Sequence, residues 1–160
     1  MTFAEEPRSL AEYETDYETI TATQRLPYLV AVDTSSSAVV GYSNAHLFHT
    51  RAAYRFTVEI SLFCDPTCTG RGLGSRLLES LLDALRDPAA HPELAPPGAR
   101  DDVKNVIALM AVDPNGKGDG LALKAFYERF GFVQVSSEVA FTSLSFPCRP
   151  SLSRATRCLY

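Results

Sequence analysis

A glycine-rich turn that leads into an amphipathic segment has the residues to bind an anion. Residues 69–75 read Thr-Gly-Arg-Gly-Leu-Gly-Ser, and leucines then recur at helical spacing as far as Leu85. The first turn of a helix offers unpaired backbone N–H groups and a partial positive charge, and glycine lets a phosphate approach the backbone closely. Arg71 and Arg76 could add charge-assisted hydrogen bonds. This segment therefore predicts a site for a phosphate or a diphosphate.

A carboxylate stands on the polar side of the segment that precedes this turn. Between residues 54 and 64 every second side chain is apolar, and the intervening residues are Arg55, Thr57, Glu59, Ser61 and Phe63. Side chains alternate between the two faces of a strand, so we expect one face in the core and the other to form a polar lane. Such a lane is commonly exposed to solvent. Beside an anion site it could instead line a cleft, with Glu59 as a proton acceptor.

Two familiar kinds of phosphate-binding loop fit the glycines poorly. A nucleotide P-loop requires Gly-Lys followed by Ser or Thr, whereas Gly116 and Lys117 are followed by Gly118. A dinucleotide-binding loop follows the first strand of an alternating parallel sheet, whereas here the glycines follow several consecutive strand segments. A nucleotide-binding module is therefore the weaker alternative, from a different functional class.

The elements that would position these residues form one α/β pattern. Apolar spacing and turn residues predict strands over residues 29–32, 39–48, 54–64, 106–112 and 132–135, and helices over residues 5–24, 73–86 and 121–130. We expect the strands over 29–32 and 106–112 to be buried. The first helix should face a core with Leu10, Tyr13, Tyr17 and Ile20. Residues 88–102 read as a surface loop and residues 113–120 as a second glycine-rich turn, and no clear element follows Ser136.

Composition indicates one compact domain without a broad cationic surface. The chain has 160 residues, of which 46% are apolar, and its formal net charge is −4, so we expect no nucleic-acid partner.

No apolar run approaches the ~20 residues that span a bilayer, and the N-terminus lacks a secretory pattern, so we expect a cytoplasmic protein without a membrane partner. The four cysteines lack zinc-site spacing, and His46 and His49 fall on opposite faces of a strand, so we expect no metal.

Two motifs in this chain resemble those of the GNAT N-acetyltransferase superfamily. Residues 69–74 match its acetyl-CoA loop, which reads Gln or Arg, two residues, Gly, one residue, and Gly or Ala, except that Thr69 occupies the first position. Residues 126–132, Phe-Tyr-Glu-Arg-Phe-Gly-Phe, match a second signature of the family. Residues 2–3, 26–31, 41–45 and 51–59 narrow the resemblance to the phosphinothricin and L-amino-acid acetyltransferase branch.

The resemblance implies a fold and a division of the chain. The fold would be α/β, with a mixed, largely antiparallel sheet and helices on both faces. Residues 1–135 would form the acetyltransferase domain and residues 136–160 a divergent C-terminal segment. Family members begin with a strand and a helix before the position of Thr2, so we expect this chain to lack that first strand. A homodimer is one oligomeric state that the family allows.

The resemblance also implies roles for individual residues in the transfer of an acetyl group from acetyl-CoA to a primary amine. Glu59 matches the family's base, and Tyr127 matches the tyrosine that protonates the departing thiolate. A backbone N–H of Leu62 or Phe63 would stabilise the oxyanion, and residues 62–64 would pair with pantetheine. The residues implied to bind acetyl-CoA are Leu62, Phe63, Cys64, Thr69, Gly70, Arg71, Gly72, Leu73, Gly74, Ser75 and Gly120. The family usually has Asn in place of Gly120 and Ser in place of Leu123.

The expected function is acetyl-CoA-dependent acetylation of a small-molecule amine. The amine would belong to a small L-amino acid or to an analogue such as phosphinothricin or methionine sulfoximine. Arg51, Tyr54 and Arg55 are candidates to bind its carboxylate, although each could equally be an ordinary surface residue. A relative that binds CoA without turnover is the alternative on the same fold.

Overall fold

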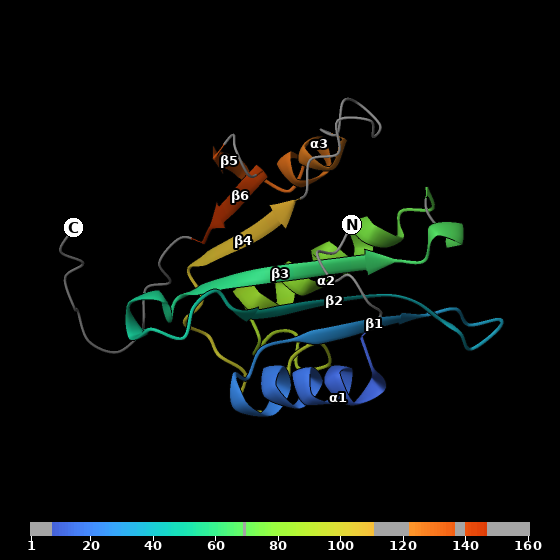
Figure 1. The fold of residues 1–160 in the computed structure, drawn as a ribbon, viewed down its shortest axis with the longest axis horizontal. Helices are drawn as coiled ribbons and strands as arrows, with labels where there is room; N and C mark the ends of the chain where they lie inside the picture. The colour runs from blue at the N-terminus through green and yellow to red at the C-terminus, as the bar shows by residue number, and fades with distance from the viewer. Residues whose placement is uncertain (1–7, 69, 111–121, 137–139, 147–160) are drawn as a thin grey trace.

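The computed structural model describes residues 8–68, 70–110, 122–136 and 140–146 (Figure 1). The helices are α1 (Leu10–Glu18), α2 (Leu73–Arg86) and α3 (Ala122–Glu128), with a π-helical turn η1 (Thr19–Thr23) and short 3-10 turns η2 (Ala52–Tyr54) and η3 (Pro66–Cys68). The strands are β1 (Tyr28–Val32), β2 (Val39–Leu47), β3 (Thr57–Cys64), β4 (Asn105–Met110), β5 (Val133–Ser136) and β6 (Ala140–Ser145).

Within the described residues, the strands form one six-stranded sheet in the order β1-β2-β3-β4-β6-β5. Only β3 and β4 run parallel, and the other neighbours are antiparallel. On one face, the rings of Tyr13 and Tyr17 in α1 contact those of Tyr42 and Tyr28. On the other face, the Ser43 hydroxyl of β2 donates a hydrogen bond to the Leu77 carbonyl of α2 (3.4 Å). The expected mixed, largely antiparallel sheet with helices on both faces is confirmed.

The core lies between the sheet and α2. The leucine stripe of α2 is buried against Val58 and Ile60 of β3 and Val106 and Ala108 of β4. Burial of several large aliphatic side chains on one side of a helix is the main stabilising contribution of such a layer. The helix ends at Arg86, ahead of Pro88, as the sequence predicts.

The first helix differs from its prediction. It begins at Leu10, where Ser9 and Glu12 form a capping box, and the π-turn η1 completes it at Thr23. No residue of α1 is buried, and Leu10 is 74% exposed, so the expected core-facing stripe was wrong except at Ile20. Tyrosine–tyrosine contacts at the margin of the sheet hold α1 instead.

Three strand predictions also need correction. The β1 strand is not buried, because it is the edge strand of the described sheet and Val30 and Val32 are half exposed. The β4 strand buries Val106, Ala108 and Met110 on one face only, since Leu109 is exposed, and residues 111–112 lie outside the described part. The β3 strand begins at Thr57 rather than at residue 54, because Tyr54 belongs to η2.

Strand β6 was not predicted. It lies between β4 and β5 and pairs with both. Its sequence alternates only weakly, because polar Thr142, Ser143 and Ser145 surround the half-buried Leu144. The strand forms because it has hydrogen-bonding partners on both sides, and a local sequence pattern does not reveal them.

Residues 88–102 form a loop without helix or strand, as predicted. Arg100 anchors it through bonds from Nε and Nη2 to the Asp102 carboxylate (2.8 and 2.9 Å) and from Nη2 to the Arg55 carbonyl (2.6 Å). The loop is therefore tied to the end of η2. The second glycine-rich turn, residues 113–120, lies outside the described residues.

Candidate functional site

A gap opens in the sheet where β3 and β4 separate. Their parallel pairing runs from Thr57 and Asn105 to Ile60 and Ala108 and then stops. Beyond that point β3 stays paired with β2 as far as Cys64, and β4 stays paired with β6 as far as Met110. Figure 1 shows the two arrows diverging past this point. The sheet therefore has an interior opening beside the last residues of β3.

The backbone of β3 directs hydrogen-bonding groups into this gap. Asp65 N–H donates to the Val40 carbonyl (2.9 Å) and Phe48 N–H to the Thr57 carbonyl (3.1 Å), so odd-numbered residues direct their polar groups toward β2. Even-numbered residues direct theirs toward β4. Leu62 and Cys64 therefore present N–H and C=O groups to the gap, beyond the last residue that is in register with β4. An extended ligand could pair with these groups as an added strand would.

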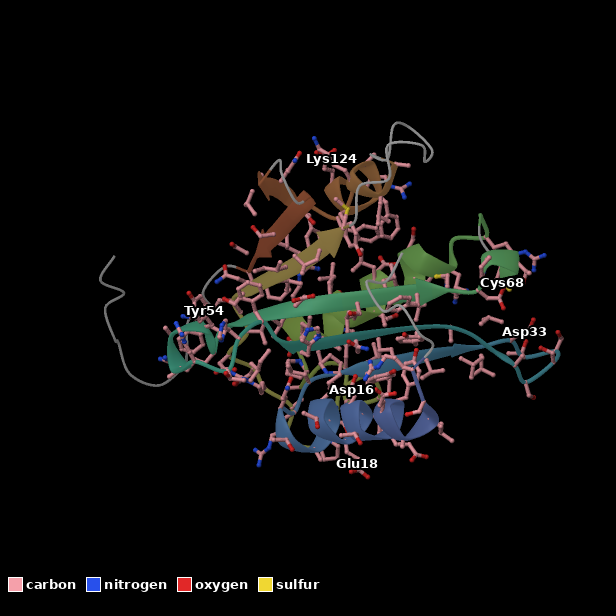
Figure 2. The ribbon with its side chains drawn as sticks, viewed as in Figure 1. Asp16, Glu18, Asp33, Tyr54, Cys68 and Lys124 are labelled. Carbon is pink, nitrogen blue, oxygen red and sulfur yellow. The ribbon has the colours of Figure 1, made fainter. Side chains whose placement is uncertain are left out.

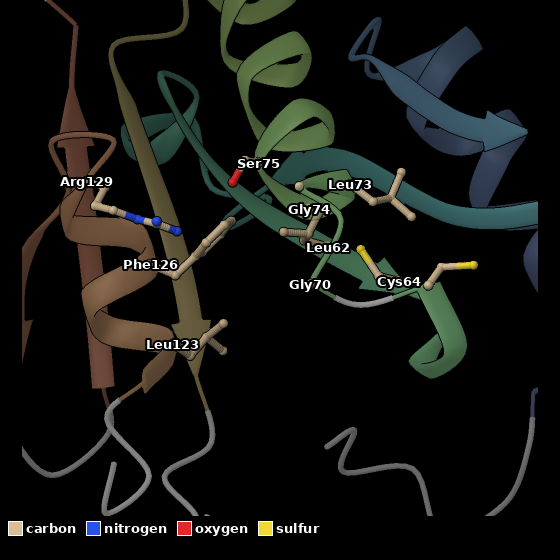
Figure 3. Close-up of a pocket in the computed structure, with 11 residues that line it drawn as sticks. Leu62, Cys64, Gly70, Leu73, Gly74, Ser75, Leu123, Phe126 and Arg129 are labelled. Carbon is tan, nitrogen blue, oxygen red and sulfur yellow. The ribbon is translucent and has the colours of Figure 1, made fainter. Parts of the chain in front are cut away.

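A pocket of about 550 Å³ adjoins this gap (Figure 3). Leu62 and Cys64 form the β3 wall, Gly70 and residues 72–75 form a second wall, and Leu123, Phe126 and Arg129 form the third. Burial raises the pKa of the Cys64 thiol, which favours its neutral form. The pocket is large enough for part of a cofactor-sized ligand.

The start of α2 faces this pocket with backbone N–H groups that have no acceptor among the described residues. Arg76 N–H is the first in the helix with an acceptor, the Gly72 carbonyl (3.0 Å), and Gly72 provides no side-chain cap. The N–H groups of residues 73–75 consequently have no partner within the helix. Gly70 and Gly72 have φ of +77° and +78°, a conformation that favours glycine, and nothing lies within 4 Å of a Cβ added at either. This geometry supports the predicted anion site.

The turn between β3 and α2 is fixed locally. The Asp65 carboxylate accepts hydrogen bonds from the Thr67 hydroxyl (2.6 Å) and backbone N–H (2.8 Å), and these bonds lower the pKa of Asp65. Cys68 N–H donates to the Asp65 carbonyl (2.9 Å), which closes η3. The chain is thereby reversed so that the glycine-rich segment lies beside the end of β3.

Glu59 lies in the polar lane with a partner that the sequence analysis missed. His46 is its direct cross-strand neighbour on β2, and His46 Nε2 lies 3.7 Å from Glu59 Oε2. The side chain of Glu59 is 21% exposed and that of His46 36%. The lane continues through Thr57, to which the Asn105 amide donates (3.5 Å). Glu59 is therefore partly enclosed among polar groups rather than fully solvated.

Tyr127 belongs to the core. It is 4% exposed, and its ring contacts those of Phe126 and Phe132. Burial raises the pKa of Tyr127 to about 12, so its hydroxyl stays protonated at neutral pH. The side chain that lines the pocket is that of the preceding residue, Phe126.

The three candidates for substrate binding lie around η2, at the start of β3. Figure 2 shows Tyr54 and Cys68 at opposite ends of β3. Arg55 Nη1 donates to the Ala52 carbonyl (3.0 Å), and its guanidinium lies 4.0 Å from the centre of the Phe56 ring, so Arg55 stabilises its own turn. Tyr54 stacks on His49, and Arg51 is exposed. None of the three lines the pocket beside Leu62.

Other predicted ligand-binding residues take different positions. The Phe63 side chain lies on the opposite face from the pocket and stacks on Tyr42, with ring centres 4.9 Å apart. Arg71 and Arg76 are exposed and line a neighbouring groove beside β1. Thr69 and Gly120 lie outside the described residues. Within the described residues, no group of three or more His, Cys, Asp or Glu could hold a metal ion.

This geometry agrees with a comparison to known families. The profile of the acetyltransferase (GNAT) family matches residues 1–132. The chain belongs to this family. The match confirms the expected N-acetyltransferase class, with acetyl-CoA as the acetyl donor.

Relatives and solved structures extend the match. The chain is 33% identical over 134 residues to phosphinothricin N-acetyltransferase from Streptomyces coelicolor, over 76% of this chain and 67% of the relative. It is 35% identical over 74 residues to L-methionine sulfoximine/L-methionine sulfone acetyltransferase from Salmonella typhimurium, over 46% and 43% of the two chains. The matches thus span about two thirds or less of these relatives.

A solved GNAT superfamily phosphinothricin acetyltransferase from Sinorhizobium meliloti, in complex with acetyl-CoA, has the same fold. The TM-score is 0.69 and the sequence identity 27%, over 99% of this chain and 80% of that chain. No helix in the described part of this chain is long and apolar enough to cross a membrane.

Proposed function

We propose that this chain acetylates the primary amine of a small L-amino acid or a close analogue, of the phosphinothricin or methionine sulfoximine type. One observation carries the proposal: the gap between β3 and β4 continues into a pocket at the uncapped start of α2. The gap and the pocket together form one trough. Its backbone N–H and C=O groups could bind both the diphosphate and the pantetheine of an acyl-CoA. The names of the relatives support the substrate class.

Acetyl-CoA fits the residues of this trough. The N–H groups of residues 73–75 would hold the diphosphate, with Arg71 and Arg76 close by on the surface. The backbone of Leu62 and Cys64 would pair with the amides of pantetheine. When bound, the thioester supplies an activated acetyl group.

The alternation of the β3 backbone supports Leu62 rather than Phe63 as the donor to the acetyl oxygen. Phe63, as an odd-numbered residue, directs its N–H toward β2, where it lies in register with Tyr42. Leu62 directs its N–H into the gap. A fixed donor at that position would stabilise the negative charge that develops on the oxygen during attack.

Glu59 is our candidate base. An amine substrate arrives mostly as an ammonium ion, so a proton must leave before the nitrogen can attack. Glu59 lies next to the last paired residue before the gap and presents a partly enclosed carboxylate. It would accept the proton directly or through one water molecule.

Tyr127 is our candidate acid for the departing thiolate. Its raised pKa keeps the hydroxyl protonated, as a donor requires. Its burial in the core supports a packing role equally well, and a variant that distinguishes the two is described below.

Arg51 is the better placed of the two arginines to bind a substrate carboxylate. Arg55 is engaged with Ala52 and Phe56, whereas Arg51 has no such partner among the described residues. Tyr54, stacked on His49, would form a side of the same site.

The test is thiol release from acetyl-CoA with a panel of amino acids. Glu59→Gln keeps the size of the side chain but removes its basicity, so we expect turnover to fall at least ~100-fold while acetyl-CoA binding, measured by calorimetry, is retained. Unchanged turnover in this variant would remove Glu59 from the mechanism. Acetyl-CoA binding without turnover on any amine would favour the inert CoA-binding alternative.

A further inference from the structure

We propose that His46 positions Glu59 and carries the proton that Glu59 accepts from the amine out to solvent. This inference rests on the proposed function, in which Glu59 is the base. It concerns the step after deprotonation, when the carboxylate must be restored before the next turnover.

The pairing of β2 with β3 places these two side chains together. His46 and Glu59 are direct partners in the antiparallel register, so they leave the sheet on the same face. At 3.7 Å, Nε2 and Oε2 are just beyond hydrogen-bond distance, and a small rotation of either side chain would bring them within it.

His46 is the titratable residue among the register neighbours of Glu59. Along β3, Thr57 and Ser61 flank Glu59 on the same face, and the partner on β4 is Ile107. The nearest residues of β2 on this face are Asn44 and His46. In this set, only the imidazole of His46 has a nitrogen that can take up a proton and release it again.

The exposure of the two side chains gives the transfer a direction. Glu59 is 21% exposed, whereas His46 is 36% exposed and so stands closer to solvent. The ammonium gives its proton to the Glu59 carboxylate, and the nitrogen lone pair then attacks. The resulting carboxyl passes the proton to the free Nε2 of a neutral His46, and the imidazolium releases it to water. Both side chains return to their starting states.

Imidazole rescue tests this route. We expect His46→Ala to lower kcat at least about tenfold, less than the loss expected for the base itself, with the KM for acetyl-CoA unchanged. Added imidazole should restore kcat in this variant, since it can occupy the vacated space and accept the proton. Imidazole should not stimulate the wild type or Glu59→Gln. Stimulation of Glu59→Gln would show that imidazole acts as a base by itself and would overturn the inference.

Two further variants separate proton transfer from a structural role. His46→Gln can still hydrogen-bond to Glu59 but cannot carry a proton, so its kcat should stay low. Full activity of His46→Gln would limit this position to orientation of Glu59 and would overturn the proton route. The matched control is His91→Ala, which removes another paired histidine, 3.6 Å from Glu93 in the 88–102 loop, and should leave kcat unchanged.

The outcomes distinguish this inference from the proposed function. If the wild type turns over and Glu59→Gln does not, but His46→Ala is fully active, the inference fails and Glu59 remains the base. If Glu59→Gln is fully active, the proposed base itself fails. Circular dichroism and Tm of His46→Ala establish that any lost activity does not come from unfolding.

Discussion

Gly74 lies where the start of α2 forms a wall of the pocket. A Cβ added at this position would lie 3.6 Å from Cys64 Sγ and 3.9 Å from Phe126 Cζ, which are ordinary contact distances. A methyl group would therefore fit the fold and would take up only a small part of the pocket.

We expect Gly74→Ala to stabilise the fold and to keep acetyl-CoA binding, because the family's loop carries Gly or Ala at this position. Alanine favours the helix over glycine, so the free energy of unfolding should rise by up to about 1 kcal/mol. The KM for acetyl-CoA should stay close to that of the wild type, since the added methyl group makes only ordinary contacts. Thermal unfolding and initial-rate kinetics measure the two effects. A lower Tm, or a clearly higher KM for acetyl-CoA, would contradict this description of the turn.

Tyr127→Phe separates the two roles of the buried tyrosine through the effect of pH. The folded state raises the pKa of Tyr127 from 10 to about 12, so its contribution to stability is complete below pH 10 and is lost as the pH rises toward 12. We expect the wild type to lose on the order of 2 kcal/mol more than Tyr127→Phe over this range, as measured by urea unfolding.

The kinetics of Tyr127→Phe test whether Tyr127 is the acid that protonates the departing thiolate. If Tyr127 protonates the thiolate, kcat near neutral pH should fall by about tenfold or more with KM unchanged. Unaltered kcat, together with the altered alkaline stability, would assign Tyr127 to the core alone.

At the scale of elements, the 88–102 loop supports the turn that carries the candidate substrate residues. The Arg100 guanidinium joins Asp102 to the Arg55 carbonyl, so it connects the loop to the end of η2. The side chain of Arg100 is mostly buried. If it is removed, water can only partly replace its hydrogen bonds to Asp102 and to the Arg55 carbonyl.

We expect Arg100→Ala to reduce the free energy of unfolding by about 1–3 kcal/mol. Because η2 adjoins the start of β3, KM for the amine should rise while KM for acetyl-CoA stays the same. Steady-state kinetics with each substrate varied in turn provides the measurement. An equal rise in both KM values would indicate a general loss of structure instead.

Sequence alone predicts the elements whose signal is local. The leucines of α2 repeat along one helix, and the glycines before it specify a turn at their own positions, so both were found. Strand β6 was missed because polar Thr142 and Ser143 form a strand only between two partners. Tyr54 was assigned to the wrong element because its alternation with Phe56 continues that of β3 across a turn.

In the candidate site, too, some features could be predicted from the local sequence and others could not. Glu59 was proposed from its place in an alternating segment, but its contact with His46 depends on the register of β2 against β3. The choice between Leu62 and Phe63 depends on which backbone groups bond to β2. Both need pairings between residues far apart in the chain, and these follow only from the assembled sheet.

At the scale of the whole molecule, acetyl-CoA should stabilise the fold and protect the gap. At 100 times its Kd the ligand should add about 2.7 kcal/mol to the free energy of unfolding. Hydrogen exchange at the N–H groups of Leu62 and Cys64 should slow on binding. A nucleotide that lacks pantetheine, such as 3′-phospho-ADP, is the control: it should slow exchange at residues 73–75 but not at Leu62. If acetyl-CoA and 3′-phospho-ADP protected the N–H of Leu62 equally, pantetheine would not bind in the gap beside β3.

The divergence of β3 from β4 affects the stability of the protein when no coenzyme is bound. Beyond Ile60 and Ala108 the described residues of the two strands are no longer paired with each other, and the coenzyme would supply hydrogen bonds to β3 only while it is bound. Each departure of CoA would return the sheet to its looser form. When acetyl-CoA is scarce, thermal unfolding and proteolysis should therefore begin at the centre of the sheet rather than at its edges.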